Sequence, residues 1–130
     1  MKLILLILLP ALLILPTGCG TACGAFASRS QSVLDQFVRL QDDALKQSGA
    51  DLTQTLQAMQ KLKTDFETKP APDCGDSAKL AILSAMNIAL DHDLKIANNQ
   101  QNAASPESQL ETRLAQIAFQ QAQGEIKRLK

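Results

Sequence analysis

The chain has 130 residues, and 13 Lys and Arg balance 13 Asp and Glu, so its formal net charge is zero. No nucleic acid or other polyanion is expected as a partner, because such partners require a basic surface. Trp and Tyr are absent and only four Phe occur, which excludes an aromatic platform for sugars or bases. One small domain with a core of Leu, Ile, Ala and Met is therefore expected.

The N-terminus carries the features of an export signal. Lys2 precedes an apolar run over 3–15 that is interrupted by Pro10. Because a helix needs about 20 apolar residues to cross a bilayer, this run favours a signal peptide over 1–18 rather than a retained membrane anchor.

Residues 15–19 read Leu-Pro-Thr-Gly-Cys and resemble the lipobox of bacterial lipoproteins, although Pro16 stands where that family prefers Leu. The resemblance implies lipidation at Cys19. In lipoproteins, an Asp directly after the lipidated cysteine resembles an inner-membrane retention signal. This chain has Gly20 at that position, so the resemblance implies the outer membrane if the host has two membranes. The alternative is cleavage at the A-x-A site over 25–27, which would release a soluble periplasmic or secreted protein.

The remainder predicts an all-α domain over 30–130, preceded by a flexible tether over 19–29. Apolar residues at helical spacing predict a first helix over 30–48. Gly49 suits a left-handed stop after it. Asp51 is expected to cap the second helix.

The second half of the chain predicts two more helices. Asp76 or Ser77 opens the third, which is the most apolar and is expected to be central. The segment 105–107, Ser-Pro-Glu, combines a cap, a proline and an acid, and predicts the start of the fourth helix. Small residues of the fourth helix are expected to approach an alanine face of the third. Four large residues are assigned to the apolar faces of these two helices: Leu80, Leu110, Leu114 and Ile117.

Short connections favour antiparallel neighbours, so the expected architecture is an up-down-up-down four-helix bundle. Three cysteines in an exported chain leave one unpaired. The bundle places Cys23, before the first helix, at the same end as Cys74, between the second and third. A disulfide between these two is therefore predicted, and it leaves Cys19 for the lipid.

Few residues suggest chemistry. The run 91–93, Asp-His-Asp, suggests a metal site at first sight, but successive helical side chains point about 100° apart, and a solvated helix face is expected instead. Met59 and Met86 fall on apolar stripes and are expected in the core rather than as cofactor ligands. No G-x-S-x-G occurs, and Cys74 has no nearby His to activate its thiol. We therefore predict no catalytic residue, no metal site and no cofactor.

A second resemblance covers the middle of the chain. Pro72-Asp73-Cys74, followed by an apolar helix pattern, is similar to small exported helical bacterial proteins of unknown function. It implies export and a helical fold, and no activity. The pattern consists of Ala78, Ile82, Leu83, Met86 and Leu90.

These features predict a lipid-anchored helical protein with a non-enzymatic binding or structural role in the cell envelope. Its expected partners are a membrane, reached through the N-terminal lipid, and another envelope protein. The alternative is a soluble secreted or periplasmic bundle that binds a small ligand or a metal.

Overall fold

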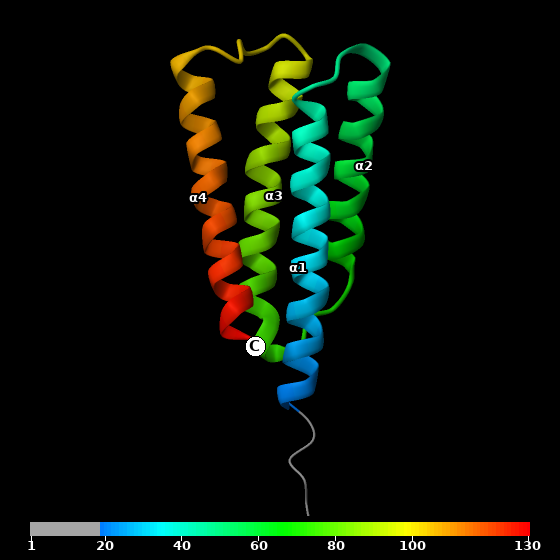
Figure 1. Ribbon diagram of the computed structural model, residues 1–130, viewed down its shortest axis with the longest axis vertical. Coiled ribbons are helices and arrows are strands. Elements are labelled where there is room, and N and C mark those ends of the chain that lie inside the picture. The colour runs from blue at the N-terminus through cyan, green and yellow to red at the C-terminus, as the bar shows by residue number, and fades with distance from the viewer. Residues whose placement is uncertain (1–18) are drawn as a thin grey trace, which may run out of the picture.

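The computed structural model describes residues 19–130, with side chains from Thr21 onwards. The signal peptide predicted over 1–18 lies outside the described residues. Four long helices stand side by side and alternate in direction (Figure 1), which confirms the all-α up-down-up-down bundle. The elements are α1 (Cys19–Ala44), α2 (Gly49–Thr68), the 3-10 turn η1 (Asp73–Gly75), α3 (Asp76–Ala97) and α4 (Pro106–Arg128).

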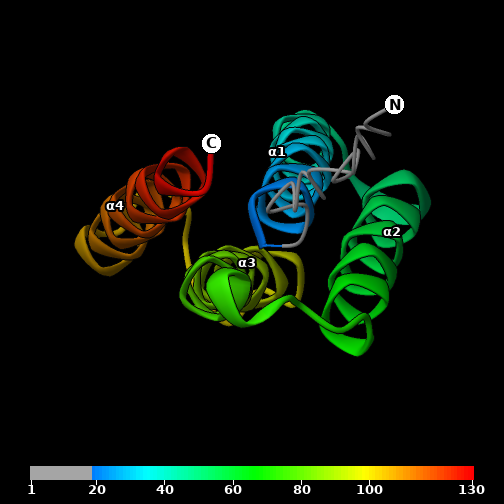
Figure 2. The same ribbon diagram turned by 90° about the horizontal axis from the view of Figure 1, so that it is seen from below.

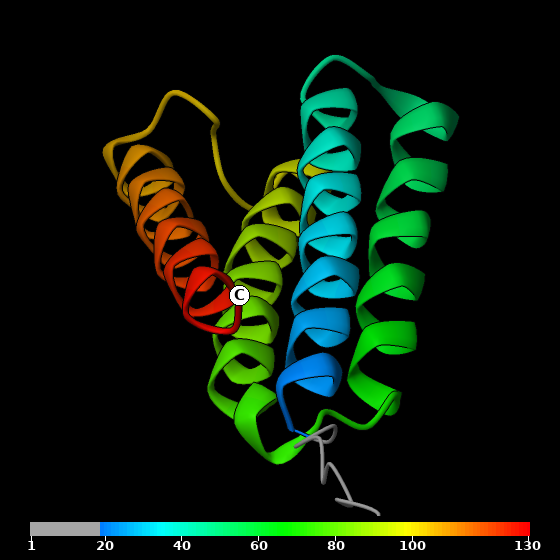
Figure 3. The same cartoon turned by 60° about the horizontal axis from the view of Figure 1, so that its bottom comes forward.

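Helix α3 is the central element, as its composition predicted. Seen from below, it lies between α2 and α4 and faces α1 (Figure 2). Helix α4 packs mainly along α3 and leans away from the paired helices α1 and α2 (Figure 3). The small residues expected between α3 and α4 are buried, and they allow this close approach: Ala85 and Ala89 of α3, and Ala115, Ala118 and Ala122 of α4.

The core is aliphatic, with two aromatic pairs. Met59 and Met86 are fully buried, which confirms their predicted place on apolar stripes. The rings of Phe37 and Phe119 lie 6.1 Å apart and link α1 to α4. Burial of such large side chains is the main stabilising term for a domain of this size.

The prediction of a flexible tether over 19–29 is wrong, because α1 begins at Cys19. Phe26 and Ala27 are buried in the core, and Ser30 is buried one turn later. Together with Cys23 these residues follow the spacing i, i+3, i+4 and i+7, which places them on one helical face. The first helix therefore belongs to the bundle from Cys23 onwards.

The start signals of the later helices were predicted with mixed success. Ser105 Oγ accepts a hydrogen bond from the Ser108 backbone N–H at 3.1 Å, which confirms the cap of α4. Gly49 has a φ of +61°, as its left-handed role requires, but it opens α2 directly. Asp51 lies within the first turn, so its predicted capping role is wrong.

Candidate functional sites

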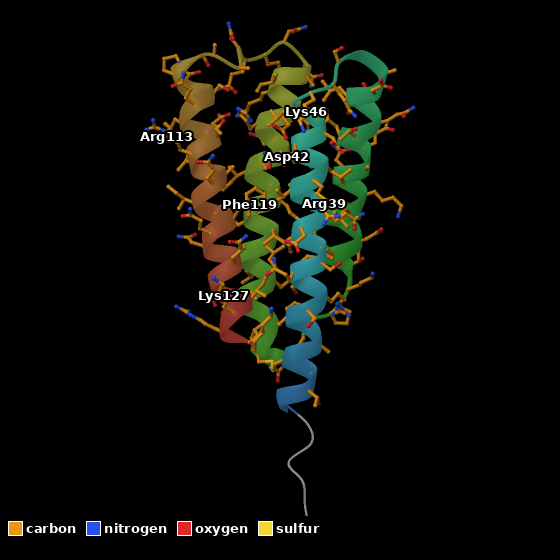
Figure 4. The ribbon with its side chains drawn as sticks, viewed as in Figure 1. Arg39, Asp42, Lys46, Arg113, Phe119 and Lys127 are labelled. Carbon is orange, nitrogen blue, oxygen red and sulfur yellow. A yellow bond between two sulfur atoms is a disulfide. The ribbon has the colours of Figure 1, made fainter. Side chains whose placement is uncertain are left out.

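The lower end of the bundle is closed by a disulfide. Cys23 of α1 and Cys74 of η1 are joined with their Cα atoms 6.2 Å apart (Figure 4), which confirms the predicted pair. Next to it, a Cβ on Gly75 would lie 2.7 Å from the ring of Phe26, so only glycine fits between the turn and α1. Cys19 begins α1 at this same end. Its lipidation stays a prediction.

A buried polar cluster lies in the opposite half of the bundle. His92 Nε2 lies 2.8 Å from the Ser108 hydroxyl of α4, and His92 Nδ1 lies 3.2 Å from Asp93 Oδ1. The prediction of a solvated face over 91–93 is therefore wrong for two of the three residues: only Asp91 is exposed, where it pairs with Lys95 at 2.8 Å. The sequence indicated the burial of His92, because His92 lies seven residues after Ala85 and therefore on the same helical face.

Asp93 is the unusual member of this cluster. Its side chain is 5% exposed, yet carboxylates are almost never buried without a partner. Among the residues that the structure describes, its Oδ2 atom has no hydrogen-bond partner. Burial raises the pKa of the Asp93 carboxyl, although the hydrogen bond with His92 acts in the opposite direction. The charged form of Asp93 is thus only half satisfied by the protein.

A small cavity of about 140 Å³ lies against Asp93. Its walls come from the end of α1, the turn before α2, the first part of α2, the end of α3 and the connector to α4. Besides Asp93, the only polar side chain lining it is that of Gln47. The apolar lining residues are Ala44, Leu45, Leu52, Ile96 and Ala103.

An apolar strip runs along the outer face of α4. Leu110, Leu114 and Ile117 are 59%, 47% and 52% exposed, and they occupy one helical face at i, i+4 and i+7. Their predicted place in the core is wrong, as is that of Leu80, which is 70% exposed on α3. The physical reason is the close approach of α3 and α4 through alanines, which leaves no room for leucine between them. Such exposed apolar groups, when contiguous, typically mark an interaction site.

Two further findings concern the described residues. In the range 19–130, no group of three or more His, Cys, Asp or Glu side chains is placed to hold a metal ion. Over the same range, no helix is long and apolar enough to span a bilayer.

Comparisons of the chain with protein-family models, with curated proteins and with solved structures give no match.

Proposed function

We propose that this protein is a lipid-anchored, non-enzymatic protein of the bacterial cell envelope, processed before Cys19, which binds another envelope protein through α4. The observation that carries the anchor is the role of residues 23–27 in the bundle. Cys23 forms the disulfide, and Phe26 and Ala27 are 3% and 0% exposed.

Processing after Ala27 would remove all three of these residues. Loss of a buried Phe costs about 3–5 kcal/mol, and loss of the disulfide about 4 kcal/mol. Small domains have only about 5–15 kcal/mol of stability in total. The shorter product would therefore lose most of its stability and keep Cys74 unpaired, which favours processing upstream at the lipobox-like segment.

The position of Cys19 also suggests how the bundle stands on the membrane. Only the first turn of α1 separates Cys19 from Cys23, a distance of about 6 Å at 1.5 Å per residue. The C-terminal residues Lys127 and Arg128 lie at the same end, where Figure 4 shows Lys127. In this geometry the basic end of α4 faces the lipid headgroups, to which each Lys or Arg adds about 1 kcal/mol of attraction if they are anionic.

The apolar strip of α4 supports the binding role. Its helical spacing fits the apolar face of a second helix, as in other helix-in-groove contacts. Helix α4 has Glu107 in its first turn and Lys127 and Arg128 in its last. A partner helix with the same polarity that runs antiparallel to α4 therefore brings unlike charges together.

This charge pattern argues for a different protein rather than a second copy. Two copies anchored through Cys19 in one membrane, both standing upright, have parallel α4 helices. Parallel helices bring Glu107 next to Glu107 and Arg128 next to Arg128, which is unfavourable. The occupant we propose is the amphipathic helix of another envelope protein.

The anchor is tested by labelling cells with a palmitate analogue. The wild-type protein is expected to take up the label and Cys19→Ser to lose it, whereas Cys74→Ser serves as the control and keeps it. A mature protein that begins at Ser28, determined by mass spectrometry, would overturn the proposal.

The binding face is tested by a photo-reactive residue in place of Leu114, crosslinked in intact cells. The matched control replaces Leu45, which is 67% exposed but lies off the strip in the turn before α2. An adduct with one different protein from position 114, absent from position 45 and lost on Ile117→Asp, supports the proposal. An adduct of twice the mass of the chain, or no adduct at all, overturns it.

A further inference from the structure

The apolar strip of α4 does not end at Ile117, because its spacing continues to the C-terminal turn of the helix. Steps of four and three residues alternate from position 110 to position 128, which is the spacing of the contact seam in a coiled coil. About five turns of helix separate the two ends of this seam, a length of roughly 27 Å at 1.5 Å per residue. All members of the seam are exposed: Leu110, Leu114, Ile117, Gln121, Gly124 and Arg128.

The lower half of the seam has no large apolar side chain of its own, and α3 supplies one there. Gln121 and Gly124 line a groove of about 500 Å³. Leu80 of α3, which is 70% exposed, lines the same groove together with Ser77 and Ala81. The exposed leucine of α3 thus lies beside the part of α4 where the leucines stop. The seam and this Leu80 groove form one continuous surface on the two neighbouring helices (Figure 2).

The charged side chains at the Leu80 groove neutralise each other. Arg128 Nη1 donates a hydrogen bond to Glu125 Oε1 at 2.8 Å, and within the described residues these two are the only charged side chains that line the groove. A charged group therefore gains little here, whereas an apolar side chain gains contact with Leu80. Gly124 leaves room for such a side chain, because a Cβ on Gly124 would meet no atom within 4 Å. The groove also exceeds the volume of roughly 150 Å³ that accepts benzene.

Gln121 sets a second requirement for a helix that covers the seam. It is the only seam member between Leu110 and Gly124 that carries a polar side chain. A covered amide costs free energy unless it is hydrogen-bonded, and one polar residue in a coiled-coil seam fixes the register of the two helices. A matching helix therefore has an amide or a hydroxyl opposite Gln121 and a large apolar side chain one turn away, opposite Gly124.

We propose that the seam and the Leu80 groove together bind one helix of about 18 residues or more, which places a Leu or Phe side chain at Gly124. This inference rests on the binding role proposed for α4 and specifies the helix that α4 binds. The dipole and the end charges of α4 favour an antiparallel partner, so the N-terminal part of the bound helix lies at the groove. Its large apolar side chain therefore precedes, in the partner's sequence, the residues that contact Leu114.

The test extends the crosslinking in intact cells to the Leu80 groove. A photo-reactive residue in place of Leu80 is expected to form an adduct with the same protein as position 114. Its matched control replaces Thr64, which is exposed on α2, on the other side of α3 from α4 (Figure 2). Mass spectrometry is expected to place the peptide reached from position 80 about 7–10 residues before the peptide reached from position 114, because Gln121 and Gly124 lie that far along α4.

Gly124→Phe fills the groove from the side of α4. In the free protein the new side chain starts in open space, so circular dichroism is expected to show an unchanged fold. The yield of the adduct from position 114 is expected to fall about tenfold or more, because the new ring occupies the place of the partner's side chain. The matched control, Gln123→Phe, places the same ring on another face of α4, outside the groove, and is expected to keep the adduct.

The outcomes separate this inference from the proposed function. An adduct from position 114 without one from position 80, or an adduct with a different protein from position 80, overturns the inference and leaves the proposed function standing. An unchanged adduct from position 114 in Gly124→Phe, or a reversed order of the two peptides, also overturns the inference. If position 114 forms no adduct in the otherwise wild-type protein, the inference and the proposed binding role both fall.

Discussion

Loss of the disulfide is expected to destabilise the protein by about 4 kcal/mol. Cys23 and Cys74 are 51 residues apart in the sequence, and the entropy of closing a loop of that length in the unfolded chain amounts to about 4 kcal/mol at 25 °C. For a domain of about 110 residues, this corresponds to a decrease in Tm of roughly 15–30 °C. The effect is large because the crosslink closes a long loop, and the entropy that it removes from the unfolded chain grows with loop length.

The measurement is urea denaturation of the oxidised and the reduced wild-type protein, followed by circular dichroism. The double variant Cys23→Ser/Cys74→Ser is the matched control, because it removes the crosslink without a reductant. It is expected to have the stability of the reduced protein, apart from the small change of side chain at Cys23, which is only 9% exposed. Equal urea midpoints for oxidised and reduced protein, or two free thiols in the native protein, would refute the reasoning.

Three other changes test the core and the surface by thermal or urea denaturation. Asp93→Asn is expected to stabilise the protein by about 1–3 kcal/mol at pH 7 and by almost nothing near pH 3. Between the ordinary pKa of 3.8 and the raised pKa of Asp93, the folded wild-type protein binds more protons than the unfolded chain, so its stability falls as pH rises. A stability gain of Asp93→Asn that is independent of pH would contradict this. Gly75→Ala is expected to lower the free energy of unfolding by about 1–3 kcal/mol, because its Cβ overlaps with Phe26. Gly24→Ala is the control: its Cβ meets no atom within 4 Å, and it is expected to raise the free energy of unfolding by about 0.5–1 kcal/mol. Equal effects of the two substitutions would refute the packing argument. Leu114→Ser is expected to change stability by less than about 0.5 kcal/mol, and a loss above about 2 kcal/mol, the cost typical of a buried Leu, would mean that the strip is part of the core.

The helical bundle could be predicted from the sequence because its signals are local. Periodic apolar residues, the Ser-Pro-Glu start of α4 and the proline-rich segment before α3 each act within one or two turns. The disulfide followed from these elements, because the order of helices places Cys23 and Cys74 at one end. The flexible tether predicted over 19–29 is wrong, although the spacing of Cys23, Phe26 and Ala27 already marked a helical face.

The cavity and the apolar strip could not be predicted, because both depend on the distance between helices. Alanine contacts bring α3 and α4 so close that Leu110 and Leu114 lie outside. An apolar stripe in a sequence specifies one face of a helix. Whether that face packs in the core or stays exposed for a partner depends on the position of the neighbouring helix. Asp93 is a comparable case, since a carboxylate within an apolar pattern is normally exposed, and only the arrangement of four elements around it encloses it.

The bundle geometry sets how far the buried Asp93 carboxylate lies from a membrane at Cys19. With the lipid on Cys19, the disulfide and the C-terminal residue Lys130 lie next to the bilayer, because α1 begins and α4 ends on that side. Helix α1 extends for 26 residues from Cys19, so the opposite end lies about 39 Å away at 1.5 Å per residue. That distance is several Debye lengths at physiological salt, about 8 Å each. The buried Asp93 carboxylate is therefore subject to its local surroundings and not to the charge of the membrane surface, and the effect of Asp93→Asn on stability should be the same for the anchored protein and for the Cys19→Ser protein.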